Sequence, residues 1–230
     1  MDVSLMIERA PDILAGIPVT LGLVSLSLLF GGIAAIGFAI MRLSSNPVLS
    51  GFSYGYVFVF RGTPLLVQIF LIYYGIGQFE AVRESFAWPV LRDAYWCAII
   101  AFSLNTAGYT AEIFRGGIMG VPHGEVEAAR AFGMSRWTAF RRIVAPSAFR
   151  LALPAYGNEI ILMLKGSALA STITLLDLTG VARTIIARTY MPIELFTMAG
   201  IIYLILTFLI VRSVRFAEYR LSPHLRPPAN

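Results

Sequence analysis

The chain has 230 residues, of which 57% are hydrophobic and only 13% are charged, and its formal net charge is +5. This composition is far more apolar than that of a soluble domain and is typical of membrane proteins. The single cysteine, Cys97, excludes an intrachain disulfide framework, and with only two histidines in the chain we expect no metal site. The basic residues lie between apolar runs, so we expect a lipid membrane and no nucleic acid as the surrounding partner.

Five apolar runs predict five membrane-spanning helices in one all-α domain over residues 1–230. The first run, about 16–41, exceeds the ~20 residues needed to cross the hydrocarbon core of a bilayer. The N-terminus before it is acidic and lacks the basic region of a cleaved signal peptide, so we interpret this run as a retained span. The remaining spans are expected at about 54–77, 95–114, 151–176 and 195–214, followed by a short polar tail from Arg215.

The second expected span, 54–77, is interrupted by Arg61, Gly62, Thr63 and Pro64. A charge, a glycine and a proline are tolerated inside a membrane run where they face protein or water. These four residues are therefore predicted to have a structural or gating role. A compatible alternative is that Arg61 simply extends its guanidinium toward the membrane surface.

The third expected span carries three polar residues on one helix face, because Asn105, Tyr109 and Glu112 are spaced i, i+4, i+7. Such a face lines a cavity or contacts another helix. Asn105 and Tyr109 are accordingly predicted to line a substrate pathway, and Glu112 is predicted to be structural or gating. For Glu112 there is a simpler alternative, an ion pair with Arg115 or Arg61.

The loop at about 121–150 is the longest polar, Arg-rich stretch of the chain. Gly124 is expected to cap a short helix, with Glu125 and Glu127 in its first turn, where the helix dipole favours anions. Gly133 is expected to end this helix in the left-handed conformation. A solvated basic loop is the alternative interpretation.

The fourth expected span contains ionisable residues, which inside a membrane are by default a functional-site hypothesis. The predicted substrate-pathway residues here are Asn158, Glu159, Lys165 and Ser167. An amino acid carries a cationic amine and an anionic carboxylate, which Glu159 and Lys165 together would pair. The alternative is a structural ion pair that ties helices or subunits together.

The Arg residues beside the spans gather on one side of the expected membrane. That side holds Arg42, Arg115, Arg130, Arg136, Arg141, Arg142, Arg150, Arg212, Arg215, Arg220 and Arg226. By the positive-inside rule, the 121–150 loop and the C-terminus are predicted to be cytoplasmic and the N-terminus external.

The loop also carries a long, fixed spacing: Glu127-Ala128-Ala129, then Gly133, then Ile143 and Pro146. This spacing resembles the E-A-A loop of the permease subunits of bacterial ABC importers, with one departure at Ala145, where the family usually has Leu. The phrases that begin at Phe60 and Thr110 resemble the polar amino acid branch of these permeases. The stretch 88–98 resembles the M-type subunits of the histidine/arginine and octopine/nopaline systems.

The resemblance implies a type I ABC importer permease fold of five transmembrane helices with a cytoplasmic coupling helix. It implies that Glu127, Ala128, Ala129, Gly133, Ile143 and Pro146 form the segment that docks into the ATPase. The implied partners are two copies of an ABC ATPase, a sister permease subunit and a periplasmic solute-binding protein, in the bacterial inner membrane.

The implied function is alternating-access import of polar or basic amino acids or opines. The chain has no phosphate loop and no catalytic motif, so it is expected to be no enzyme and to bind no cofactor, and ATP and Mg²⁺ are expected in the ATPase subunit. An ion-coupled carrier or channel without an ATPase is the rival hypothesis, and an integral membrane enzyme is a weaker one.

Overall fold

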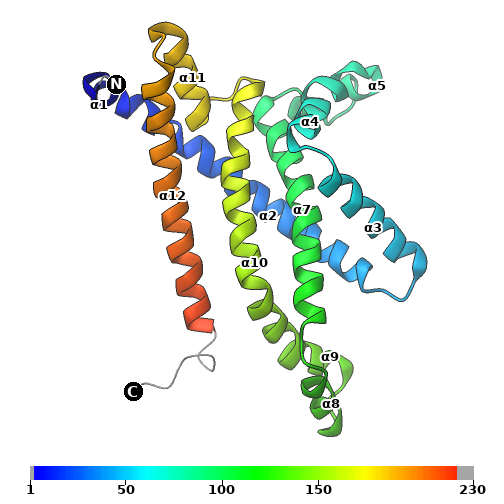
Figure 1. Cartoon of the computed structure of the whole chain (residues 1–230). Helices are drawn as coiled ribbons and strands as arrows, with labels where there is room; N and C mark the ends of the chain where they lie inside the picture. Colours follow the sequence, from blue (N-terminus) through cyan, green and yellow to red (C-terminus); the bar gives the residue numbers. More distant parts are fainter. Residues whose placement is uncertain (1–2, 222–230) are drawn as a thin grey trace, which may run out of the picture.

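The computed structural model describes residues 3–221, and these residues form helices and connecting turns without a strand. Two long helices, α7 (Ala94–Met119) and α10 (Ala145–Gly166), lie side by side at the centre of the molecule (Figure 1). Helix α2 (Ile17–Arg42) crosses and packs along α7, and α12 (Pro192–Leu221) packs against α10.

Shorter elements connect these helices and cover their ends. They are α1 (Val3–Leu14), α3 (Pro47–Gly62), α4 (Leu65–Phe70), the π-helical η1 (Leu71–Gly75), the 3-10 turn η2 (Ile76–Gln78), α5 (Glu80–Arg83), α6 (Trp88–Leu91), α8 (His123–Ala131), α9 (Arg136–Ala139), the π-helical η3 (Phe140–Val144), the 3-10 helix η4 (Ser167–Ile173) and α11 (Leu178–Thr189). In Figure 1, α1 and α11 lie at one end of the long helices, and α8 and α9 lie at the other.

Three of the helices within residues 3–221 are long and apolar enough to cross a membrane: α2, α7 and α12. Two bent pairs raise this number to as many as five, by length and composition. The segments Pro47–Gly62 and Leu65–Gln78 meet at 102°, and the segments Arg136–Ile173 and Leu178–Thr189 meet at 45°. The predicted interruption of the span 54–77 is thus a sharp bend, because the chain turns at Thr63 and Pro64.

The helices also extend beyond the predicted spans. Helix α7 continues past residue 114 to Met119, and α10 begins at Ala145 and follows η3 without a break, with Pro146 in its first turn. Most of the predicted 121–150 loop is consequently helical. Helix α12 continues to Leu221, so the predicted polar tail is helical at its start, and residues 222–230 lie outside the described residues.

Small residues allow α7 to approach both of its neighbours closely. A Cβ added at Gly31 of α2 would collide with Thr106 and with the Ser103 carbonyl oxygen, and one added at Gly117 would lie 2.6 Å from the Ala148 carbonyl oxygen of α10. Close contact through small residues is the usual way that membrane helices pack. It brings the polar face of α7 into direct contact with α10.

Candidate functional site

Three of the predicted pathway residues line one cavity of about 200 Å³ between α4, α7 and α10. Asn105 and Tyr109 come from α7 and Glu159 comes from α10. The remaining lining residues are Leu65, Leu162 and Met163. The shared face that the i, i+4 spacing predicted on α7 thus does border a cavity, and we call it the Glu159 cavity.

Glu159 is only 5% exposed, and one hydroxyl group is its hydrogen-bond donor. Thr106 Oγ1 donates to Glu159 Oε1 at 2.7 Å, and no Lys or Arg among residues 3–221 lies within ion-pair distance of this carboxylate. A buried carboxylate with no ion-pair partner is costly, because a single hydrogen bond offsets only part of the desolvation of its charge. The cavity therefore offers an anionic group that a cationic ligand would satisfy. Sequence reasoning missed Thr106, which lies 53 positions from Glu159.

Asn105 is held in place by the break between α3 and α4. Thr63 is extended there (φ −112°, ψ 145°), as expected for a residue before proline. The Gln68 amide donates to the carbonyl oxygens of Phe60 and Thr63 at 2.9 and 3.2 Å, and the Asn105 amide donates to Phe60 O at 3.2 Å and to Gln68 Oε1 at 3.0 Å. These side chains satisfy carbonyl groups that the break removes from the helix ladder. Gln68 was not predicted from the sequence.

The other predicted pathway residues, on α10 and at the start of η4, lie outside this cavity. Asn158 and Lys165 are exposed, and seven positions along a helix place them on one face that does not include Glu159. Ser167 is fully buried and donates to the Leu164 carbonyl oxygen at 2.7 Å, so its hydroxyl is satisfied locally. Glu159 and Lys165, predicted to bind the two charges of a solute together, thus do not line the same cavity.

A second cavity, of about 360 Å³, lies between α2, α3 and α7, and we call it the Arg61 cavity. It is lined by Arg42, Tyr54, Val57, Phe58, Arg61, Gly62, Tyr109 and Glu112. Tyr109 lines both cavities. The Arg61 guanidinium lies over the Tyr109 ring, 5.1 Å from its centroid, and the ion pairs of Glu112 within residues 3–221 are with other arginines.

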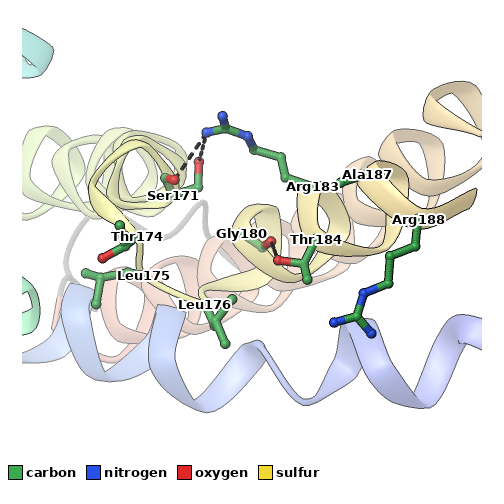
Figure 2. A pocket seen from close by; sticks show the side chains of 9 residues that line it. All are labelled: Ser171, Thr174, Leu175, Leu176, Gly180, Arg183, Thr184, Ala187 and Arg188. Atoms are coloured by element: carbon green, nitrogen blue, oxygen red, sulfur yellow. Dashed lines mark hydrogen bonds between the residues drawn. The ribbon is translucent and has the colours of Figure 1, made fainter. Parts of the chain in front are cut away.

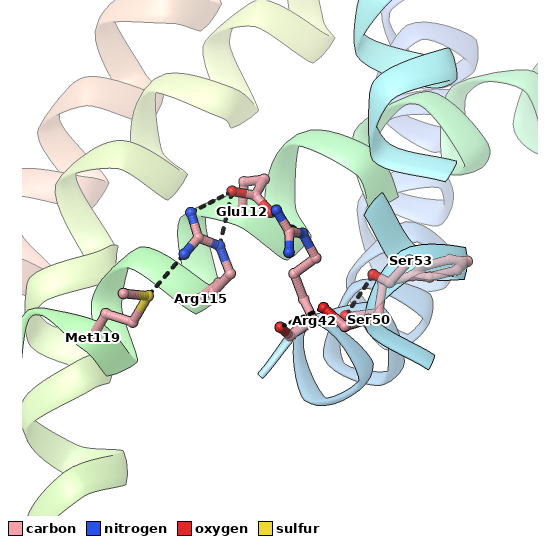
Figure 3. Close-up of polar contacts among 7 residues, drawn as sticks. Arg42, Ser50, Ser53, Glu112, Arg115 and Met119 are labelled. Atoms are coloured by element: carbon pink, nitrogen blue, oxygen red, sulfur yellow. Dashed lines mark hydrogen bonds and ion pairs between the residues drawn. The ribbon is translucent and has the colours of Figure 1, made fainter. Parts of the chain in front are cut away.

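Glu112 instead binds two other arginines (Figure 3). Arg115 Nε and a terminal nitrogen donate to Glu112 Oε2 at 2.9 and 2.7 Å, and Arg42 Nε lies 3.3 Å from Oε1. The Glu112–Arg115 pair was the simpler of the two predicted roles. Arg42 was missed, because it lies on another helix and the sequence offers no spacing rule for it.

Helix α8 ends where the sequence predicted, at Gly133. Gly133 has a φ of +74°, its N–H donates to Arg130 O at 2.9 Å, and the Met134 N–H donates to Ala129 O at 3.1 Å. This pair of bonds is the Schellman arrangement, in which a left-handed glycine closes a helix. The predicted start was wrong: α8 begins at His123 after Pro122, one residue before Gly124.

The rest of the E-A-A spacing forms one unit with α8 at the end of α7 and α10 (Figure 1). Glu127 and Ala128 are exposed and Ala129 is buried. Ile143 lies in η3 and Pro146 in the first turn of α10. The Ser147 hydroxyl donates to Glu125 at 3.1 Å and so ties α10 to α8. Two strongly exposed aromatic residues nearby, Phe132 and Trp137, were not singled out from the sequence.

A third cavity, of about 400 Å³, lies at the other end of the molecule beside α11, and no predicted site residue lines it (Figure 2). Arg183 reaches across its edge and donates to the Ser171 carbonyl oxygen at 3.1 Å. Arg188 lines the same cavity from the last turn of α11. The guanidinium of Arg183 thus has a protein acceptor, whereas that of Arg61 has none among residues 3–221.

Solved structures share this fold. A crystal structure of an amino acid ABC transporter with histidines matches with a TM-score of 0.85 and 35% identity, covering 96% of this chain and 99% of that one. An inward-facing methionine ABC transporter matches with a TM-score of 0.75 at 16% identity, covering 93% of this chain and 98% of that one, which shows similarity of fold alone.

Proteins that are similar in sequence are also components of transport systems. The nopaline transport system permease protein NocM of Agrobacterium fabrum is 53% identical over 98% of this chain and 94% of its own length. The histidine/lysine/arginine/ornithine transport system permease protein HisM of Escherichia coli is 45% identical over 92% of this chain and 90% of its own length. A family model described as "Binding-protein-dependent transport system inner membrane component" matches residues 27–223. The chain therefore belongs to this family of inner membrane transport components and has the type I ABC permease fold.

Proposed function

We propose that this chain is a permease subunit of an ATP-driven importer for basic amino acids or opines. One observation carries the substrate class: the buried Glu159 carboxylate faces a cavity and has no cationic partner among the described residues. A guanidinium, imidazolium or ammonium group would neutralise it. The names of NocM and HisM, which specify nopaline and basic amino acids, agree with that charge.

The residues that line the Glu159 cavity would contact different parts of the solute. Glu159, oriented by Thr106, would bind the cationic group of the solute. Asn105, fixed by its bonds to Gln68 and Phe60, would present one wall with a constant orientation. Leu65, Leu162 and Met163 would contact the aliphatic part of the solute and exclude water.

ATP would drive the transport through α8. The residues Glu127, Ala128, Ala129, Gly133, Ile143 and Pro146 would dock this end of the molecule to the ATPase, with Phe132 and Trp137 adding apolar contacts. Helix α10 follows α9 and η3 directly and carries Glu159, so a displacement of α8 would reach the cavity. Closure of the ATPases on ATP would shift the equilibrium between two states that bind the solute differently.

The assembly would contain two ATPase copies, which hold ATP and Mg²⁺, a sister permease and a periplasmic binding protein. The Arg-rich end with α8 would face the cytoplasm, and α1 would face the periplasm. This chain would then perform no catalysis itself. The rival hypothesis, an ion-coupled carrier or channel, requires neither an ATPase nor the E-A-A spacing, and family membership argues against it.

The test is co-purification of the ATPase with this permease from cells that express the complex, followed by ATP-dependent uptake in proteoliposomes. We expect Glu127→Lys to weaken ATPase co-purification, because it reverses a charge on the exposed face of α8. Arg183→Gln, at the opposite end, is the matched control. Solute transport or ion conduction by the isolated chain, with no ATPase bound, would overturn the proposal.

A further inference from the structure

The Glu159 cavity and the Arg61 cavity meet at one side chain. Asn105 and Tyr109 line the first, and Tyr109 and Glu112 line the second. These three residues follow one another down the same face of α7, at ~1.5 Å of rise per residue. The Arg61 cavity therefore lies one step closer to α8, and Tyr109 is the partition between the two cavities.

The two cavities have opposite charge. The lining of the first holds one carboxylate, Glu159, and no basic side chain. At the second, Arg42 and Arg115 share the single carboxylate of Glu112. Arg61 is left without a carboxylate, because its guanidinium has no ion pair or hydrogen bond to any of residues 3–221 and its contact there is the Tyr109 ring.

The free guanidinium of Arg61 has the chemistry of a carboxylate site. A guanidinium offers a planar fork of N–H donors that matches a carboxylate in two parallel hydrogen bonds. Its stacking on Tyr109 fixes the plane of that fork at the wall of a cavity of about 360 Å³. The excess positive charge of Arg42, Arg61 and Arg115 over Glu112 would attract an anionic group to the same place.

We propose that Arg61 binds a carboxylate of the transported solute on the α8 side of Tyr109. This inference rests on the proposed function and assigns a second half to its site. The cationic group of the solute is bound by Glu159, its carboxylate is bound by Arg61, and the Tyr109 ring contacts the stem between them. Arg61 thus takes the role predicted for Lys165, which is exposed and lines neither cavity.

The experiment compares two solutes that differ only in the carboxylate: arginine and its decarboxylated analogue agmatine. Their dissociation constants are measured on the purified permease–ATPase complex without the binding protein. We expect arginine to bind at least about tenfold more tightly than agmatine, since a charge-assisted hydrogen bond contributes on the order of that factor. Arg61→Gln should bring the ratio close to one by weakening arginine alone.

Two variants serve as controls. Arg61→Lys keeps the positive charge but loses the planar fork of donors, so we expect a preference for arginine over agmatine between those of the wild type and Arg61→Gln. A general folding defect would instead weaken the binding of both solutes. Arg183→Gln removes an arginine that already binds Ser171 and should leave the ratio unchanged.

The outcomes separate the two proposals. A ratio that Arg61→Gln does not change overturns this inference. The inference is also overturned if solute binding in lipid nanodiscs depends on phosphatidylglycerol, Arg61→Gln abolishes that dependence, and the ratio of the two dissociation constants stays unchanged. The cavity would then be assigned to an anionic lipid head group. If Glu159→Gln leaves both dissociation constants unchanged, Glu159 does not bind the cationic group of the solute, and the proposed function is contradicted independently of the result for Arg61.

Discussion

Helix α8 and the buried cluster around Glu159 are both polar segments of an apolar chain, but they are built in different ways. The end of α8 is fixed by bonds between neighbours, from Gly133 to Arg130 and from Met134 to Ala129. In the cluster, Thr106 reaches Glu159 across 53 positions and Asn105 reaches Gln68 across 37. The first can form in any chain with this local sequence, whereas the second exists only after α3, α4, α7 and α10 have assembled.

This difference suits the two tasks. A docking helix needs an outer face that stays free for a partner, and local bonds leave Glu127 and Ala128 exposed. A solute cavity needs groups from several helices, so that relative movement of the helices changes the cavity. Substitutions in the buried cluster should therefore reduce solute uptake or thermal stability, whereas substitutions in α8 should reduce ATPase binding.

The largest effect is expected from Glu159→Gln. Loss of the charged acceptor removes an interaction of about 1.5–3 kcal/mol with a cationic group, so uptake of a basic amino acid should fall about 10- to 100-fold. ATP-dependent uptake in proteoliposomes measures it, with Glu159→Asp as the control that keeps the charge. Wild-type uptake by the Gln variant would remove Glu159 from the solute path.

Gln68→Leu tests whether the cluster depends on distant contacts. The substitution leaves the Thr63 carbonyl group without its amide donor and removes the acceptor of Asn105, which should destabilise the fold by about 1–2 kcal/mol. Thermal unfolding of the purified complex measures the loss. Gln78→Leu is the matched control, because Gln78 is exposed and bonds only within its own turn. Equal melting temperatures for both variants would contradict the account of the α3–α4 break.

Gly133→Ala tests the local region. A Cβ at φ +74° costs about 1 kcal/mol, so α8 should end less sharply and ATPase binding should weaken several-fold, while the thermal stability of the permease itself changes little. Titration of the ATPase onto the immobilised permease measures the affinity. Gly124→Ala is the control, since that glycine lies in open space within α8. A similar loss in both variants would show that the left-handed conformation has no special role.

The smallest effect is expected from Glu112→Gln. This carboxylate is partly buried between Arg42 and Arg115, and a Gln amide in its place keeps one acceptor oxygen for Arg115, so the loss should be about 1 kcal/mol. The change in melting temperature should thus be smaller than that of Gln68→Leu. A larger change would mean that Glu112 belongs to the buried cluster.

The sequence predicted the local features well for physical reasons. Apolar runs longer than a bilayer is thick indicated the membrane class. Glycine after a polar helix indicated the left-handed end at Gly133, because only backbone conformation within a few residues decides it. The i, i+4 spacing of Asn105 and Tyr109 correctly placed them on one cavity-lining face.

The remaining features depend on how helices pack. The 102° bend at Pro64 was read as a mere interruption, since a proline signals a break but not its angle. Glu159 and Lys165 are predicted to bind the two opposite charges of an amino acid, but six positions on a helix point their side chains in different directions. The partners Thr106, Gln68 and Arg42 come from other helices and became visible only in the assembled bundle.

The π-helical segment η3 has a mechanical consequence for the whole molecule. The Ala145 N–H bonds to Phe140 O, five residues back, so η3 holds one residue more than an α-helical turn would. A π-turn of this kind is a place where a long helix bends, because the extra residue interrupts the regular i to i−4 ladder. Because η3 lies between α8 and Glu159, a push on α8 would bend the rod from Arg136 to Ile173 at η3 and tilt the part that carries the Glu159 carboxylate.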